Sequence, residues 1–139
     1  CALPILGGRY VFPFGSVKFV PALHSSGYEI DGVMTYMGEA SGIILEAEDK
    51  KIYHAGDTAL FSDMRLFAKD KSIDVAFLPI GDNYTMGPED ALEAVSYLNP
   101  KITIPIHYNT FPVIQQNPAI FVEQVVGGKV LNPGETILV

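Results

Sequence analysis

Apolar positions along the chain fall into short runs separated by glycine, proline and acidic residues. Tyr10–Phe14 and Val17–Val20 alternate β-branched and aromatic residues on either side of a glycine, which predicts two strands joined by a tight turn. Ser41–Glu46 and Lys51–Ala55 predict two more strands around a polar turn. Residues 25–40 show no clear period, so we expect a loop there.

The following residues alternate helical and strand-like patterns. Apolar residues between positions 61 and 67 recur at helical spacing, and the nearly continuous apolar run Ile73–Ile80 predicts a buried strand. Pro88 suits the first turn of a helix that ends at Asn99-Pro100, and Lys101–Ile106 predicts another buried strand. The order strand, helix, strand predicts a layered α/β fold.

The C-terminal stretch completes this pattern. Pro118–Val126 predicts a last helix, which Gly127-Gly128 would stop, and Val130 with Thr136–Val139 is expected to close an edge of the sheet. No repeat, low-complexity stretch or linker interrupts the sequence. We therefore expect residues 1–139 to form part of a single domain.

Composition agrees with a folded domain and excludes some partners. Of the 139 residues, 48% are hydrophobic and 18% are charged, which is too apolar for a disordered chain. The net charge is −7 and the basic residues are scattered, so nucleic acid is disfavoured as a partner. The only cysteine is Cys1, which excludes an intrachain disulfide and favours a cytoplasmic location. No apolar run approaches the roughly 20 residues of a membrane helix, and no membrane partner is expected.

Three potential metal ligands follow three predicted strands. His24 and His107 come directly after apolar runs, and Asp57 stands in a Gly-Asp-Thr turn after another. Ligands at the ends of adjacent strands can converge on one edge of a sheet, and imidazole with carboxylate suits zinc and neighbouring divalent ions. Structural histidines, and an N-cap role for Asp57, are the alternatives at this point.

Four segments resemble the C-terminal metal-ligand motifs of the metallo-β-lactamase superfamily. They are Pro21-Ala-Leu-His24-Ser-Ser-Gly27, Tyr53-His-Ala-Gly-Asp57-Thr58, Leu78 to Ala91, and Ile104-Pro-Ile-His107-Tyr-Asn-Thr110. The resemblance is to the branch of small metal-dependent hydrolases similar to ribonuclease Z and the lactonase-like proteins. It implies that the chain is the C-terminal portion of a four-layer αββα metallo-β-lactamase sandwich.

The resemblance also implies a mechanism and a role for each ligand. His24 would bind the first of two divalent metal ions, Asp57 would bridge both, and His107 would bind the second. Zinc is the expected metal, with manganese or nickel as alternatives, because such a site accepts several ions. Water activated by the dinuclear site would cleave an ester, lactone, amide or phosphodiester bond of a small-molecule substrate.

One motif of that superfamily, His-x-His-x-Asp-His, is absent from these 139 residues. Because the chain also starts abruptly without an initiator methionine, we expect it to be a fragment. The expected partner is a complementary N-terminal fragment that carries the motif, since an exposed inner sheet face would be a large apolar patch that favours association. A homo-oligomer is left open.

Four further residues are candidates for the site. His54 could donate a proton or orient Asp57, although strand alternation places it on the face of Ile52, which favours a structural role. Asp82, Asn83 and Asn109 lie in loops after strands, where substrate contacts are common, and are candidate substrate-binding residues. Turn roles are the alternative for Asp82 and Asn83.

Two other functions compete with the metal-dependent hydrolase. Asp57 could be a phosphoryl-accepting nucleophile, as in haloacid dehalogenase-like phosphatases, but these need a second acid two residues later, where Ala59 stands. The other is a non-catalytic α/β binding or assembly module with structural histidines. The fold does not identify the substrate, because substrate specificity on one fold changes with the loops.

Overall fold

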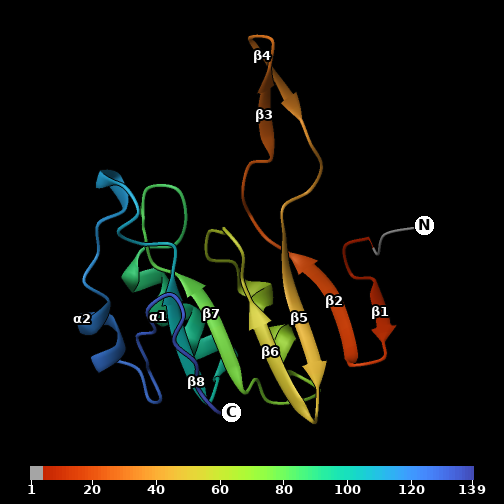
Figure 1. The fold of residues 1–139 in the computed structure, drawn as a ribbon, viewed down its shortest axis with the longest axis vertical. Coiled ribbons are helices and arrows are strands. Elements are labelled where there is room, and N and C mark those ends of the chain that lie inside the picture. Colours follow the sequence, from red (N-terminus) through yellow and green to blue (C-terminus); the bar gives the residue numbers. More distant parts are fainter. Residues whose placement is uncertain (1–4) are drawn as a thin grey trace.

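A six-stranded mixed sheet forms the centre of the molecule (Figure 1). The computed structural model describes residues 5–139, so Cys1 lies outside the described residues. The strand order is β1-β2-β5-β6-β7-β8. The strands are β1 (Arg9–Phe12), β2 (Gly15–Pro21), β5 (Ser41–Ala47), β6 (Lys50–His54), β7 (Val75–Pro79) and β8 (Ile102–Ile106). The six strands predicted before residue 107 are therefore confirmed, with ends shifted by one or two residues.

Strand direction decides which loops meet. The pairs β1–β2, β2–β5 and β5–β6 are antiparallel, whereas β6–β7 and β7–β8 are parallel. Two reversals bring β2 back to the direction of β6, so β2, β6, β7 and β8 all end at the same edge of the sheet. The loops after these four strands are consequently neighbours, although they are far apart in sequence.

Helices cover one face of the sheet and create the core. The 3-10 helix η1 (Ser62–Ala68) and α1 (Pro88–Leu98) pack on this face, and α2 (Pro118–Glu123) packs next to β8. The short η2 (Pro112–Ile114) lies in the loop after β8. Tyr53, Leu78 and Ile44 of the sheet are buried against Met64 of η1 and Leu98 of α1. Within residues 5–139, no helix is long and apolar enough to cross a membrane.

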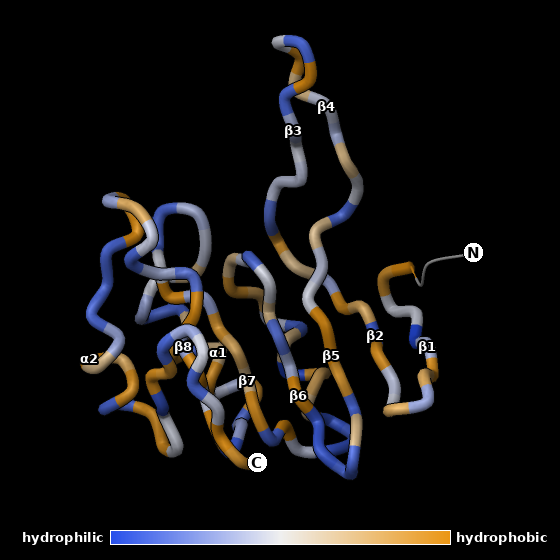
Figure 2. Tube along the Cα trace, viewed as in Figure 1, coloured by the Kyte–Doolittle hydropathy of each residue, from blue (hydrophilic) through white to orange (hydrophobic). Residues whose placement is uncertain are grey.

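The opposite face of the sheet is apolar as well. Cross-strand register aligns Phe19, Ile43, His54, Phe77 and Ile104 in one row across five strands. Figure 2 shows that β5 and β7 are apolar over much of their length. Only part of this face is covered, by the C-terminal segment 131–139 that crosses it near β7 and β8. The row remains half-exposed toward β2 and β5, where Ile43 is exposed.

A hairpin projects from the sheet where a loop was expected, so that expectation was wrong (Figure 1). Its strands β3 (Gly27–Ile30) and β4 (Val33–Tyr36) pair antiparallel, with Ile30 opposite Val33. The two-residue turn is Asp31-Gly32, and both residues have positive φ, 51° and 79°. Asp-Gly is the turn pair that favours such a hairpin, so the local signal was present in the sequence.

The expected C-terminal edge strand is also absent from the structure. Residues 130–139 contain no strand, and only an isolated bridge from Thr103 to Gly128 extends the sheet beyond β8. The last helix is shorter than expected, because α2 ends at Glu123. In the segment 131–139, Leu131 and Ile137 are half-buried and line a hollow on the apolar face of the sheet, whereas Leu138 is 99% exposed.

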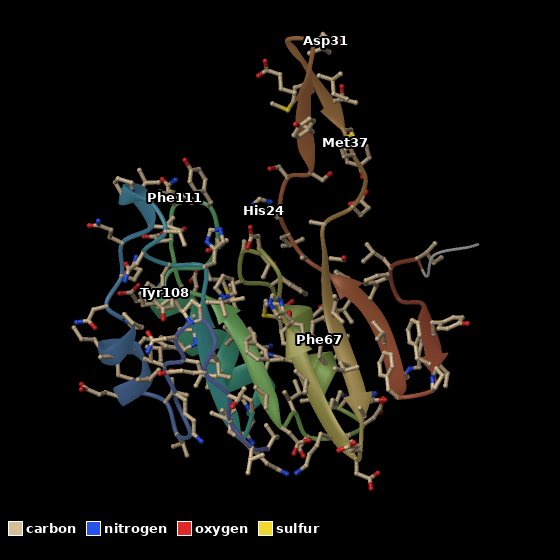
Figure 3. All side chains as sticks on the ribbon, viewed as in Figure 1. His24, Asp31, Met37, Phe67, Tyr108 and Phe111 are labelled. Atoms are coloured by element: carbon tan, nitrogen blue, oxygen red, sulfur yellow. The ribbon has the colours of Figure 1, made fainter. Side chains whose placement is uncertain are left out.

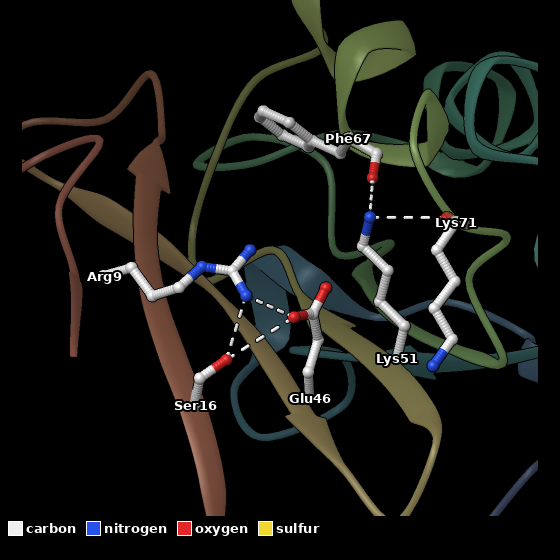
Figure 4. A network of polar contacts seen from close by, with 6 residues as sticks. All are labelled: Arg9, Ser16, Glu46, Lys51, Phe67 and Lys71. Atoms are coloured by element: carbon white, nitrogen blue, oxygen red, sulfur yellow. Dashed lines mark hydrogen bonds and ion pairs between the residues drawn. The ribbon is translucent and has the colours of Figure 1, made fainter. Parts of the chain in front are cut away.

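A polar network lies at the edge of the sheet opposite to the convergent loops (Figure 4). Lys51 is buried, and its Nζ donates hydrogen bonds to the carbonyl oxygens of Phe67 (2.5 Å) and Lys71 (3.3 Å). Its ammonium therefore satisfies carbonyl groups at the end of η1. Burial lowers the pKa of Lys51. Nearby, the guanidinium of Arg9 pairs with Glu46 and lowers the pKa of that carboxyl.

Asp74 joins the starts of three parallel strands. Its buried carboxylate accepts hydrogen bonds from the Lys51 backbone N–H and from the Lys101 ammonium, both at 2.8 Å. Lys101 lowers the pKa of Asp74 through this bond. A carboxyl with a lowered pKa stabilises the fold above its unfolded pKa of about 3.9, and this stabilisation disappears as the pH falls through the folded pKa.

We therefore expect Asp74→Asn to lower the free energy of unfolding by about 1–3 kcal/mol at neutral pH, because a buried donor loses its charged acceptor. The difference from wild type should shrink as the pH falls below about 4. Urea denaturation at neutral and acidic pH measures both effects. Asp49→Asn, at an exposed position in the β5–β6 turn, is the control and should change little. A difference that is independent of pH would contradict the assignment.

Candidate metal site

A pocket of about 420 Å³ lies at the edge where four strands end. The loops after β2, β6, β7 and β8 supply its lining, which is Leu23, His24, Ser25, Asp57, Asn83, Tyr84 and His107. All three expected metal ligands are in this set. In Figure 3, His24 lies at the base of the β3–β4 hairpin, and Phe111 lies in the neighbouring loop.

His107 and Asp57 face each other across the pocket. Nε2 of His107 lies 3.3 Å from Oδ2 of Asp57, and both side chains are partly exposed. This separation exceeds the roughly 2.7–2.9 Å of a charge-assisted hydrogen bond. In a tetrahedral zinc site with bonds of about 2.0–2.2 Å, neighbouring ligand atoms lie roughly 3.4 Å apart. The spacing of the two atoms therefore suits two donors that share one cation.

An unusual backbone conformation at the end of β8 orients the His107 side chain. His107 has φ 53°, a left-handed conformation that is uncommon outside glycine and clusters at functional sites. Gly81, after β7, allows the His107 backbone to come close, because a Cβ at Gly81 would lie 2.4 Å from the His107 carbonyl oxygen. The Nδ1 atom of His107 is buried without a hydrogen-bond partner in the described part of the chain.

A local hydrogen bond orients the ring of His24. Its Nδ1 lies 2.7 Å from the Ser25 carbonyl oxygen, which can only accept, so Nδ1 carries the proton. In the neutral ring, Nε2 then keeps a lone pair for a metal. Among residues 5–139, however, no three His, Cys, Asp or Glu side chains come close enough to enclose an ion. The donors fit a divalent metal chemically, with His107 and Asp57 paired and His24 on the same pocket.

Thr58 holds the ligand loops together. It is fully buried, and its hydroxyl accepts a hydrogen bond from the Leu23 N–H at 2.9 Å. Its carbonyl oxygen accepts from the Met86 N–H at 2.9 Å, and the Ala59 N–H donates to the Leu23 carbonyl at 3.0 Å. Three separate loops are thereby tied at one residue next to Asp57.

Three of the other predicted site residues lie outside the pocket lining. The ring of His54 stacks on Phe77, and its Nδ1 accepts a hydrogen bond from the Gly56 N–H at 3.1 Å. Burial lowers the pKa of His54, and the nearby Asp57 charge opposes this shift. Asp82 accepts from the Asn83 and Thr85 N–H groups of its own turn.

Asn109 closes its own loop, because its side-chain oxygen accepts from the Gln116 N–H at 2.8 Å. Asn83 does line the pocket, as expected. The sequence interpretation missed Thr58, Leu23 and Tyr84. Leu23 and Thr58 are immediate neighbours of predicted ligands in the sequence, and this adjacency was the available signal.

The comparisons with known proteins agree with this geometry. The family model "Beta-lactamase superfamily domain" matches residues 5–108. A UPF0173 metal-dependent hydrolase from Enterococcus faecalis is 98% identical over 134 residues, which are 96% of this chain and 60% of that protein. Igni18, a metallo hydrolase from the archaeon Ignicoccus hospitalis, superposes with a TM-score of 0.82 at 36% identity, covering 96% of this chain and 58% of the other.

A third similar protein, from Thermotoga maritima, is assigned to the metallo-beta-lactamase superfamily. Its structure has a TM-score of 0.64 at 26% identity and covers 90% of this chain and 58% of its own. These matches, together with an α/β sheet that places two histidines and an aspartate at one edge, define the class of protein. The chain belongs to the metallo-β-lactamase superfamily, which confirms the resemblance and the α/β fold class. It spans about 60% of the length of the curated relatives it matches.

Proposed function

We propose that this chain contributes three ligands to a metal-dependent hydrolase. The observation that carries the proposal is the pairing of His107 Nε2 with Asp57 Oδ2 at 3.3 Å, with His24 lining the same pocket. The relatives named metal-dependent hydrolases support the same activity. The expected bond is an ester, lactone, amide or phosphodiester.

Two divalent ions, zinc first among the candidates, would supply hydroxide from water near neutral pH and polarise the scissile bond. The residues of this chain would hold and orient them. His24 offers Nε2, because its other nitrogen donates to Ser25. Asp57 has two diverging oxygens and would be the ligand shared by both ions, while His107 would bind the second ion. Asn83 lies on the same pocket and can hydrogen-bond the substrate.

The remaining ligands would come from the part of the protein that this chain does not span. The half-exposed apolar row of Phe19, Ile43 and Phe77 supports a partner segment, because such a face is normally covered. We propose that a segment carrying His-x-His-x-Asp-His packs there. We refer to this chain completed by the remaining part of the Enterococcus faecalis relative as the full-length form.

Metal removal tests the proposed function. We expect the full-length form to contain bound divalent metal and to hydrolyse at least one simple ester or phosphodiester. Dialysis against EDTA should abolish the hydrolysis, and addition of zinc, manganese or nickel should restore it, because the metal supplies the nucleophile. Elemental analysis and a chromogenic assay measure both effects. Full activity in a protein freed of metal would exclude the mechanism, and a full-length form that neither binds metal nor hydrolyses these compounds would favour a binding module.

A further inference from the structure

The β3–β4 hairpin stands away from the rest of the fold. It projects beyond the edge of the sheet at which the candidate ligands lie (Figure 1), and Figure 3 places Asp31 at its tip. Within residues 5–139, β3 and β4 pack on each other and on no other helix or strand to a comparable extent. A two-stranded hairpin alone is only marginally stable in water, so this hairpin needs a surface to pack on.

One face of the hairpin is apolar and uncharged. Tyr28 lies opposite Thr35 and Ile30 lies opposite Val33, and strand alternation places these two pairs on the same face, which we call face A. Tyr28, Ile30 and Val33 are 67%, 45% and 64% exposed. Face A therefore presents a continuous apolar surface that the described part of the chain leaves uncovered.

The other face, face B, combines apolar residues with a charge. Its cross-strand pairs are Gly27 with Tyr36 and Glu29 with Met34. Met34 lies over Gly27, because a Cβ at Gly27 would meet the Met34 sulfur at 2.8 Å. Two copies of face B in contact would bring two glutamates together in apolar surroundings, and such a contact of like charges is unfavourable. Face A has no such obstacle to meeting a second copy of itself.

The exposed area of face A matches a small dimer interface. Taking about 150–250 Å² for each fully exposed large side chain, its three apolar residues expose roughly 350 Å² per copy. Two copies would together remove roughly 700 Å² of apolar surface from water. Because interfaces are about 60% apolar, the total buried area would be roughly 1,200 Å², the lower end for specific protein interfaces.

From these observations we propose that the full-length form is a homodimer in which face A of one copy packs against face A of the second copy around a two-fold axis. Such an axis brings the same surface of both copies together, so the surface must complement itself, as an uncharged apolar face does. Face B stays outside this contact. Because β3 follows His24 closely in the sequence, the contact would also restrain the loop that carries this candidate ligand. The proposal goes beyond the proposed function, since the contact requires neither metal nor substrate.

Analytical ultracentrifugation of the full-length form between about 1 and 100 µM tests the proposal. We expect a reversible equilibrium between monomer and dimer with a Kd on the order of 10 µM, as suits an interface of this size. Val33→Glu should weaken the association by at least about tenfold, because it places two like charges near the two-fold axis.

Met34→Glu is the matched control. Met34 is the next residue of β4 and is 68% exposed, but it lies on face B. This variant should associate within about threefold of the wild type, as is usual for a surface substitution outside an interface.

A charge exchange separates a lost interface from a misfolded hairpin. Val33→Lys alone should also be monomeric, whereas an equimolar mixture of Val33→Glu and Val33→Lys should associate, because opposite charges then meet at the axis. A mixture that stays monomeric would overturn the proposed contact.

Other outcomes would also overturn the dimer. A wild-type full-length form that stays monomeric at every concentration would do so, and slow hydrogen exchange in β3 and β4 of that monomer would show that the remaining part of the protein covers the hairpin. Equal losses of association in Val33→Glu and Met34→Glu would contradict the assignment to face A. None of these measurements uses hydrolysis, so a monomer leaves the metal-dependent hydrolase standing, and an inactive protein that still dimerises through face A leaves this inference standing.

Discussion

Replacing Asp57 by Asn in the full-length form is expected to lower kcat/KM for hydrolysis by at least about a hundredfold, because loss of even an indirect metal contact costs 10–100-fold. Asp57 is the one carboxylate that lines the pocket, and its Oδ2 lies 3.3 Å from His107 Nε2. The neutral amide keeps the shape of the side chain and removes the negative charge that two cations would share. Metal content should fall together with activity.

The same variant separates a ligand from a turn residue. If Asp57 only caps a turn, Asn replaces it almost equally well, so both stability and hydrolysis stay nearly unchanged. If it binds metal, activity and metal content fall, while urea denaturation of the metal-free protein changes by less than about 1 kcal/mol. Asp63→Asn, at an exposed position a few residues further on, is the control. Unchanged steady-state kinetics for Asp57→Asn would remove the residue from the site.

The sequence predicted the strands that carry the candidate ligands better than it predicted the periphery of the fold. Each of His24, Asp57 and His107 follows an apolar run, and such runs mark buried strands reliably because burial demands them. Their meeting at one edge depends on strand direction. The reversal through β5 makes β2 parallel to β6. The short polar turn between β5 and β6 is visible in the sequence, whereas β2 and β5 are joined by the long segment 22–40.

Residues outside the strand-end pattern were harder to anticipate. Tyr84 and Phe111 are separated by 27 positions and meet only because β7 and β8 are neighbours. No local period encodes such a contact. Thr58 was interpreted only as part of a turn. Its hydrogen bond with Leu23, 35 residues away, cannot be predicted from the neighbouring sequence.

The two errors in the fold have different causes. The β3–β4 hairpin was missed although Asp31-Gly32 supplies the correct turn chemistry, because its strands expose apolar side chains on both sides and show no alternation. The C-terminal strand was expected from the β-branched and apolar residues at 136–139, but propensity cannot say whether a free strand edge is available. There the apolar residues pack on a sheet face, as Ile137 does near Ile104.

Replacing Thr58 by Val is expected to reduce both stability and activity, because it removes a buried hydroxyl without changing the volume of the side chain. The Leu23 N–H, bonded to Oγ1 at 2.9 Å, would lose its acceptor, which costs about 1–3 kcal/mol of unfolding free energy. His24 follows Leu23 directly, so the loop that carries this ligand would lose its tie to the Asp57 loop. We expect kcat/KM and metal affinity to fall by about 10–100-fold, as for other groups that orient metal ligands.

Thr58→Ser makes the opposite change to Thr58→Val. It distinguishes a residue that positions the His24 and Asp57 loops from one that only fills space in the core. It keeps the hydroxyl and deletes a buried methyl group, at a cost of about 1 kcal/mol. If Thr58 positions the ligand loops, Val lowers activity and Ser preserves it, although both lower stability. If Thr58 only fills space, activity follows stability in both variants.

Thr103 offers the matched control, because it is also fully buried but its hydroxyl has no partner among the described residues. Thr103→Val should be neutral or stabilising, since it removes an unsatisfied polar group. Metal titration, steady-state kinetics and urea denaturation of the three variants therefore decide the role of Thr58. Equal losses of activity in Thr58→Val and Thr58→Ser would show that the hydroxyl does not hold the His24 and Asp57 loops in place.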